Sequence, residues 1–406
     1  MKSAGGHLIY TKKEVGQRIP IEFSRLLECP LDPVALMNLC SNYNVLEQDD
    51  EAFRYAERAV HSLPWMNAKT YLNYACILRQ YGRHEEAFPY IQRAHQILPN
   101  DQMMGHIYAE ELIRKGRWLE AWPLCSRYRE SKQWIAPKGV QEWKGEDLNG
   151  KRIMVITEGG RGDAFWLFRF YLKLHEMGAI VSYCTFPDVG EYLKDHPWCH
   201  MDEEEKNPRL KDDVVFYDKE HPYDYWVSIF ELLQWLKVDK PWFPGTYLEG
   251  DPKRVPLPRN GKPLVGICWE CGEAMDVRKF RSLKLDQAAQ LISNRNVEWI
   301  SLQKGYKAPE GCREPEIRSW NDTASIISNL DLVITVDTSI VHLAGAMGKD
   351  TWLILGGYQD CKWGREDTSG WYPSVKIFRN STVGFDGTVT QIQKSLDSYR
   401  HSVANS

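Results

Sequence analysis

The sequence predicts a chain of the α + α/β class, in which N-terminal helical pairs precede two units built on parallel sheets. Three observations support this prediction. A motif recurs at intervals of 34 or 35 residues within the first 130 residues. Short apolar runs alternate with helical stretches from about residue 150. A proline-rich passage, 251–263, divides this second part and indicates a hinge between two sheets.

Composition and charge are those of an ordinary globular protein. The 406 residues suffice for two or three domains, and 43% of them are hydrophobic, so each domain can bury a core. With a formal net charge of −4 and a pI of about 6.3, nucleic-acid binding would need a local basic patch. The first 23 residues lack the apolar segment of a secretory signal, and no apolar run approaches the roughly 20 residues of a membrane span. We therefore expect a soluble, cytoplasmic protein.

The recurring motif predicts the helical part. Ala87 follows Ala52 by 35 positions and precedes Ala121 by 34, while Gly82 separates two helical patterns. Alanines at these positions let two antiparallel helices pack closely, and the glycine permits the turn between them. The pattern resembles the tetratricopeptide repeat and predicts about three repeats.

From about residue 150 the pattern becomes that of buried strands joined by helices, which is typical of parallel sheets. The strands expected before the proline-rich passage are Ile153–Thr157, Ile180–Cys184, Val214–Tyr217 and Tyr225–Val227. Those expected after it are Leu264–Cys268, Glu298–Leu302, Leu332–Val336, Trp352–Leu355 and Val375–Phe378. The predicted division of the chain is an N-terminal extension, a repeat domain and two α/β domains, at 1–31, 32–135, 136–255 and 256–406.

The first candidate site follows the first of these strands, within 153–169. The strand runs into a glycine-rich turn that contains Gly160, Gly162 and Asp163. Glycines at the carboxyl edge of a parallel sheet let the backbone approach a ligand, and Asp163 would face the same crevice. The alternative is that Asp163 only caps the helix that follows.

The second candidate site is the segment 331–348, in which a buried strand is followed at once by Asp337, Thr338 and Ser339. The unpaired N–H groups of the helix that begins there, together with two hydroxyls, would suit a diphosphate. The same residues would also cap any helix, and we expect capping, not phosphate contact, of the Asp337 carboxylate. His342, one turn into the helix, would either face the phosphates or lie in the core.

The third candidate site combines the end of the strand Leu264–Cys268 with the segment SLQKG at 301–305. Four cationic side chains follow that strand and could neutralise a departing diphosphate without a metal, although an exposed loop is the alternative; they are Arg278, Lys279, Arg281 and Lys284. Cys268 and Cys271 form a C-x-x-C pair. No second pair and no histidines at ligand spacing follow them, so we predict neither a metal site nor a redox site.

Together, and in this order, these segments resemble glycosyltransferase family nine, the ADP-heptose:lipopolysaccharide heptosyltransferases, and its tetratricopeptide-fused relatives. The resemblance covers essentially the whole chain and is most specific in the sequence VDTSIVHLAGAMGK. It implies a GT-B fold, that is, two Rossmann-like domains facing a cleft, and sugar transfer with inversion and without a metal.

The resemblance also implies roles for individual residues. Asp163 would be the catalytic base, and the segment from Asp337 to His342 would contact the donor diphosphate. The donor-binding residues expected in all are Gly160, Gly162, Trp269, Arg281, Gln303, Lys304, Asp337, Thr338, Ser339 and His342. Where relatives carry a small-residue Gly-Asn stretch after the tryptophan, this chain has Glu270-Cys271-Gly272-Glu273. The resemblance therefore does not predict which sugar or nucleotide is used.

The predicted function is an inverting, metal-independent glycosyltransferase that takes a hexosyl, heptosyl or pentosyl group from a nucleotide sugar and needs no cofactor. The acceptor would be a hydroxyl of a glycan, a protein or a modified DNA base, held by the repeats. One alternative is a non-catalytic repeat scaffold with a degenerate GT-B portion, against which the presence of both Asp163 and 337–342 argues. A second is a sugar-nucleotide epimerase, which would have no use for a domain that holds a large acceptor.

Overall fold

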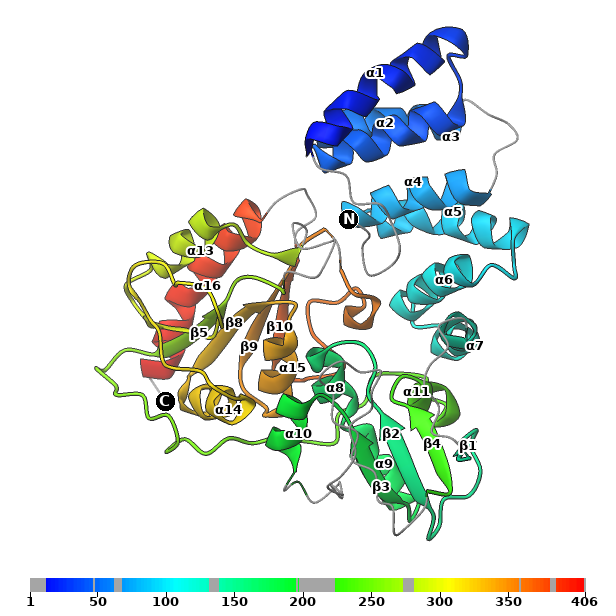
Figure 1. Cartoon of the computed structure of the whole chain (residues 1–406). Helices are drawn as coiled ribbons and strands as arrows, with labels where there is room; N and C mark the ends of the chain where they lie inside the picture. Colours follow the sequence, from blue (N-terminus) through cyan, green and yellow to red (C-terminus); the bar gives the residue numbers. More distant parts are fainter. Residues whose placement is uncertain are drawn as a thin grey trace.

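The computed structural model describes residues 12–46, 48–61, 68–130, 139–194, 196, 223–272, 281–357, 359–379 and 385–404. In this part of the chain, N-terminal helices are followed by two parallel sheets with helices around them (Figure 1). The predicted α + α/β class is thereby confirmed: helical repeats precede two Rossmann-like units in a GT-B arrangement.

The N-terminal helices form the predicted pairs. Their bounds are α1 (Lys12–Glu28), α2 (Pro33–Val45), α3 (Asp49–His61), α4 (Ala68–Gln80), α5 (His84–Ile97), α6 (Gln102–Arg114) and α7 (Trp118–Glu130). Helix α2 packs on α3, α4 on α5 and α6 on α7. Gly82 and Gly116 adopt φ of 73° and 75° at the turns of the second and third pairs, a conformation that favours glycine. Helix α1 lies in the predicted extension and was not foreseen.

The first sheet has the strand order β1-β4-β2-β3, with all neighbours parallel. Its strands are β1 (Gln141–Glu142), β2 (Arg152–Ile156), β3 (Ile180–Cys184) and β4 (Tyr225–Ser228). The helices of this unit are α8 (Arg161–Leu167), α9 (Phe170–Glu176), α10 (Pro187–Leu193) and α11 (Glu231–Trp235). The chain turns from β2 to β3 on one side and reaches β4 on the other, so the crevice of this sheet lies beyond the end of β2.

The second sheet has the order β10-β9-β8-β5-β6-β7, again parallel throughout. Its strands are β5 (Leu264–Cys268), β6 (Glu298–Ser301), β7 (Cys312–Arg313), β8 (Leu332–Val336), β9 (Thr351–Leu355) and β10 (Val375–Arg379). Its helices are α13 (Leu285–Ile292), α14 (Trp320–Asn329), α15 (Ser339–Ala346), the short 3-10 helix η1 (Cys361–Trp363) and α16 (Asp386–Ala404). Read from β7, this is the order 3-2-1-4-5-6 of Rossmann folds, in which ligands bind beyond the ends of the two central strands. Here those strands are β5 and β8.

The predicted strands that fall on described residues agree with these bounds to within one residue, and those at β3, β5 and β8 coincide with them. The predicted strand Val214–Tyr217 lies outside the described residues. Strands β1 and β7, of two residues each, were not predicted because so short a segment shows no periodic pattern.

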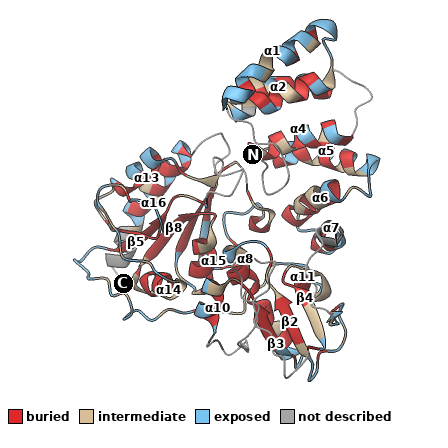
Figure 2. Cartoon of the chain, viewed as in Figure 1, coloured by how far each residue is buried: buried red, intermediate tan, exposed pale blue. Residues whose placement is uncertain are grey.

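Buried side chains fill the strands and the helix faces turned toward them (Figure 2). One hydrophobic cluster continues from α6 and α7 through the first α/β unit to α15. Within it, Trp118 of α7 meets the ring of Trp371 edge-on at 5.5 Å, and the indole N–H of Trp122 donates to the carbonyl of Val238. The repeats therefore share a core with both α/β units and are not tethered beside them. None of the described helices has the length and apolar character of a membrane-spanning helix.

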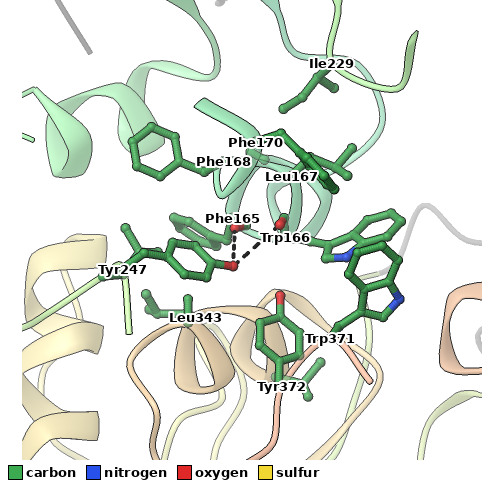
Figure 3. Close-up of a cluster of buried hydrophobic side chains, with 14 of the residues drawn as sticks. Phe165, Trp166, Leu167, Phe168, Phe170, Ile229, Tyr247, Leu343, Trp371 and Tyr372 are labelled. Carbon is green, nitrogen blue, oxygen red and sulfur yellow. Dashed lines mark hydrogen bonds between the residues drawn. The ribbon is translucent and has the colours of Figure 1, made fainter. Parts of the chain in front are cut away.

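The two α/β units meet at a buried cation. The guanidinium of Arg169, which is fully buried, donates to the carbonyls of Trp166, Trp242 and Trp371 and to the hydroxyl of Tyr247, at 2.6–2.9 Å. The Tyr247 hydroxyl in turn donates to the Phe165 carbonyl at 3.0 Å. Figure 3 shows Phe165 and Trp166 of α8 facing Leu343, Trp371 and Tyr372 of the second unit across this contact.

We predict that Arg169→Met destabilises the protein strongly. Three buried carbonyls would lose their donor at roughly 1–3 kcal/mol each, so the free energy of unfolding should fall by at least about 3 kcal/mol. Chemical denaturation measures this change. Arg117→Met is the matched control, because the exposed Arg117 pairs with Glu120 at the surface, just before α7, and its loss should leave stability nearly unchanged. Equal midpoints for the two variants would contradict the role given to Arg169.

Candidate functional site

Helices α8 and α15, one from each α/β unit, touch at their first turns, and this contact is the centre of the candidate site. A Cβ atom added to Gly162 would lie 2.8 Å from Cδ2 of His342 and 3.3 Å from the Cα of Ser339. Only glycine therefore allows this approach. The glycine-rich and hydroxyl-rich segments that the sequence singled out thus meet at this contact, although Gly162 and Ser339 are 177 positions apart.

Asp163 is positioned by the turn before α8. The backbone N–H of Gly160 donates to Asp163 Oδ2 at 2.9 Å, and a Cβ on Gly159, where φ is +85°, would meet the same oxygen at 2.6 Å. The carboxylate thus caps the helix, as the alternative interpretation held, but its side chain is also 24% exposed. Burial raises the pKa of Asp163, and the Lys362 ammonium and the Gly160 N–H only partly oppose this.

Two charged residues that the sequence analysis did not identify lie beside this carboxylate. Lys362, on η1, places its ammonium 3.9 Å from Asp163 Oδ1 and 2.7 Å from Asp360 Oδ2. Burial lowers the pKa of Lys362, but the charges of the three carboxylates around it, above all Asp360, outweigh burial and leave this pKa raised. The rule that sites form at the carboxyl ends of parallel strands could have pointed to the loop after β9, which contains both residues.

A cavity of about 470 Å³ opens in front of Asp163. One wall comes from the repeats, another from the first α/β unit, and the η1 loop closes it. Its lining includes His106, Glu110, Ile113, Trp118, Trp122, Cys125, Glu158, Asp163, Trp166, Phe230, Leu233, Asp360 and Lys362. Glu158 is a second carboxylate in this lining and accepts a hydrogen bond from the Ser228 hydroxyl. The cavity is therefore apolar and aromatic, with a few convergent charged groups, as ligand sites commonly are.

The start of α15 differs in one respect from the prediction. Thr338, not Asp337, is the N-cap residue, and its hydroxyl accepts from the N–H of Ile340 at 3.3 Å. Asp337 instead pairs with Arg281, whose guanidinium lies 2.7 Å from Asp337 Oδ2 and donates to the Asp337 carbonyl at 2.8 Å. The expected capping role of Asp337 is thus wrong, because its carboxylate pairs with Arg281 from a distant segment.

The end of β5 is held by a side-chain clamp. Oε1 of Gln303 accepts from the backbone N–H groups of Trp269 and Glu270 at 3.2 and 3.0 Å, while its Nε2 donates to the Glu270 carbonyl. The Trp269 indole is packed in the core of the second unit. Both residues thus shape the strand end, and a contact with the donor by either remains a prediction.

A second cavity, of about 320 Å³, lies on the other side of the first turn of α8. It is lined by Arg161, Asp188, Leu302, Lys304, Ile317, Arg318, Ser319, Trp320, Thr323 and Ile340. Three of these are cations, and Ser319 is the N-cap of α14. Arg161 borders this cavity and Asp163 the other, so the α8 turn lies between them. The second cavity, called the cationic cavity below, contains three cations and one carboxylate, Asp188, which pairs with Arg161 at 2.7 Å.

His342 is buried at the junction between α8 and α15. Its Nδ1 lies 3.0 Å from the Tyr372 hydroxyl, and its ring stacks on Trp363 at 5.2 Å. Burial, reinforced by the charge of Lys362, lowers the pKa of His342 well below its ordinary value, so the folded protein holds a neutral imidazole. The histidine is therefore a core residue that packs against Gly162, and contact between His342 and the donor phosphates remains a prediction.

Two of the remaining sequence candidates, Arg278 and Lys279, are outside the described residues, and Lys284 is the exposed N-cap of α13. Cys268 and Cys271 are free thiols. Among the described residues, no group of three histidine, cysteine, aspartate or glutamate side chains is placed to hold a metal ion.

The fold and the junction define a class of protein: helical repeats that share a core with two Rossmann-like units facing a common crevice. No family model matches the chain. The chain is 26% identical over 343 residues to Protein FlbA of Caulobacter vibrioides, an alignment that covers 74% of this chain and 56% of FlbA. The chain thus spans about half the length of this relative.

Solved structures with low overall similarity include both parts of the architecture. A mutant of the O-GlcNAc transferase of Thermobaculum terrenum is 13% identical, with 97% of this chain and 91% of that chain covered at a TM-score of 0.32. YrrB, a TPR protein with an unusual peptide-binding site, is 18% identical, with 41% and 73% covered at a TM-score of 0.28. At these TM-scores neither structure identifies an activity.

We predict that Gly162→Ala separates α8 from α15. The added methyl group would overlap His342 and the α15 backbone, and overpacking of this kind typically costs about 1–3 kcal/mol in the free energy of unfolding. Gly105→Ala in α6 is the control, because its Cβ would meet only Leu124, at an ordinary 3.8 Å, and alanine favours a helix. If both variants unfold at the wild-type denaturant concentration, the close contact between the two helices is not as described.

Proposed function

We propose that the chain is an inverting glycosyltransferase that moves a sugar from a nucleotide sugar to an acceptor hydroxyl. The observation that supports this most directly is the α8–α15 junction. There a partly exposed carboxylate, Asp163, and a helix start, Thr338–Ser339, lie together between two Rossmann-like units, with a separate cavity on each side.

The donor is proposed to occupy the cationic cavity. Its lining comes mainly from the second α/β unit: from the segment after β6, the start of α14 and the first turn of α15 after the central strand β8. Arg161, Lys304 and Arg318 would offset the charge of the diphosphate, and the N–H groups at the start of α15 would bind its oxygens. Arg281 would act indirectly, because its pairing with Asp337 fixes the turn before α15.

The acceptor is proposed to enter the cavity in front of Asp163. Because Ile113, Trp118 and Trp122 of the repeats line that cavity, the repeats would contact the acceptor directly and not only tether it. A hydroxyl that reaches the Asp163 carboxylate would come from the side opposite the donor cavity. This placement suits attack from the face opposite the leaving group.

The proposed reaction is a single displacement. The acceptor oxygen forms a bond to the anomeric carbon as the bond to the diphosphate breaks, and the hydroxyl proton passes to Asp163. The bonding electrons leave with the nucleoside diphosphate, whose new charge the cations and the α15 start stabilise. Inversion follows from attack on the opposite face. A positioned base of this kind contributes roughly 10²–10⁴-fold to the rate.

We predict that Asp163→Asn lowers transfer, or hydrolysis of the donor, by at least about 10²-fold. The asparagine oxygen can still accept from the Gly160 N–H, so folding and binding of a nucleoside diphosphate, followed by thermal shift, should persist. Nucleotide sugars would be screened first to find the donor. Glu158→Gln is the comparison, because Glu158 is a second carboxylate of the same cavity. A larger loss in Glu158→Gln than in Asp163→Asn would assign the base to Glu158.

We further predict that activity survives removal of divalent metals. The described part of the chain offers cations and a helix start for the diphosphate but no cluster of metal ligands. Turnover after treatment with EDTA should therefore stay within about twofold of the untreated rate, well below the fold-changes expected of a catalytic group. A loss of activity that Mg²⁺ or Mn²⁺ restores would refute metal independence.

A further inference from the structure

Lys362 and Asp360 form a charged pair in the wall of the acceptor cavity. The Lys362 side chain is only 6% exposed, and its ammonium touches Asp360 at 2.7 Å while standing 3.9 Å from Asp163. It also lies over the ring of Trp166, 5.3 Å from its centroid. One buried cation is thus shared between two carboxylates, and only one of those carboxylates has a role in the proposed reaction.

The loop that presents this pair is fixed by the repeats. Arg114 of α6 donates to the carbonyl of Gln359 at 2.7 Å, and Arg379 of β10 hydrogen-bonds the side chain of the same residue. On the other side of the loop, a Cβ on Gly357 would lie 2.2 Å from the carbonyl oxygen of Gln80 in α4. The position of Lys362 is therefore set by contacts from three elements that are distant in sequence.

We propose that Lys362 and Asp360 are positioning residues that set the ionisation of Asp163. This inference rests on the proposed function, because it concerns the group assigned there as the base. Lys362 favours the charged, proton-accepting form of Asp163, and Asp360 limits that effect by holding the ammonium on its own side. The pair favours the ionised form of Asp163 without tying its oxygen into a close ion pair that would block access to the acceptor proton.

The direction of each effect follows from the charges around Asp163. The acidic and basic side chains that line the cavity with Asp163 are Glu158 after β2, Asp360 and Lys362 on the η1 loop, and His106 and Glu110 on α6, and Asp337 contributes its charge from the turn before α15. Burial raises the pKa of Asp163, the Lys362 charge lowers it, and Asp360 and Asp337 raise it. The Lys362 charge is the largest contribution that lowers this pKa.

Removal of Lys362 and removal of Asp360 should shift the pKa of Asp163 in opposite directions. Lys362→Met deletes the neighbouring cation and leaves Asp360 as an uncompensated anion, so the pKa of Asp163 should rise by about 1–3 units. Asp360→Asn frees the ammonium to approach Asp163, so that pKa should fall. Lys362→Arg keeps the charge and should restore the wild-type value. A residue that served only to hold the loop would not give shifts of opposite sign.

The experiment combines two readouts. The titration of the Asp163 carboxyl is followed by NMR in the full chain labelled with ¹³C-aspartate, with its signal assigned from Asp163→Asn. The dependence of kcat/KM on pH is then measured for the same variants. Since a base must be ionised to act, the acidic limb should move up in pH in Lys362→Met and down in Asp360→Asn. The KM for the donor, which binds in the other cavity, should change little. Lys376→Met, on the exposed face of β10, is the matched control.

The outcomes separate this inference from the proposed function. If Asp163 titrates as expected in all variants but no nucleotide sugar is turned over, the electrostatic role stands and the transferase function fails. If the protein transfers sugar but Lys362→Met leaves both the titration and the acidic limb unchanged, the inference is overturned. It is equally overturned if Lys362→Met and Asp360→Asn shift the limb in the same direction.

Discussion

The buried guanidinium of Arg169 is the constraint on which the rest of this structure depends. A charge removed from water is costly unless its donors find partners, and each nitrogen of Arg169 donates a hydrogen bond, to carbonyls from three segments and to the Tyr247 hydroxyl. One of these segments belongs to the first α/β unit, one to the connection between the units and one to the second unit. If the two α/β units separated at this point, the Arg169 guanidinium would lose its hydrogen-bond partners. The geometry of the nearby contact between α8 and α15 is therefore fixed as well.

That fixed geometry explains how two weak local signals become one site. A glycine-rich turn and a hydroxyl-rich helix start are each common, and each also has a purely structural use, which the structure shows in the Gly160–Asp163 and Thr338–Ile340 hydrogen bonds. What distinguishes them here is that Gly162 lets them touch. Asp163 can both cap α8 and take part in a reaction, because the hydrogen bond that caps the start of the helix also orients the carboxylate that faces the cavity.

The parts of the fold that the sequence predicted are those encoded locally. Strands β3, β5 and β8 are largely apolar runs, and Asp163 and Thr338 lie in the segments that follow β2 and β8, so the rule about the carboxyl edge of a parallel sheet points to them. Helix α1 was missed because the segment has no counterpart in the repeat pattern and contains Pro20. The role of Asp337 was misjudged because local capping propensity says nothing about Arg281, which arrives from another segment.

The sequence could indicate the loop after β9 as part of the sheet edge, but not the roles of Lys362 and Asp360 within it. Their segment is a loop without hydrophobic periodicity, and two residues that carry opposite charges two positions apart usually form an ordinary surface pair. They lie beside Asp163 only because α4 and α6 bury the loop that carries them, through contacts with Gly357 and Gln359. The repeats thus contribute to the site twice: they supply the aromatic wall of one cavity, and they hold the loop that presents a cation to the carboxylate. A helical-repeat region that is part of the site in this way cannot move independently of it. A small shift of α6 would move Lys362 relative to Asp163 and change the Coulomb interaction between them, which depends on their separation.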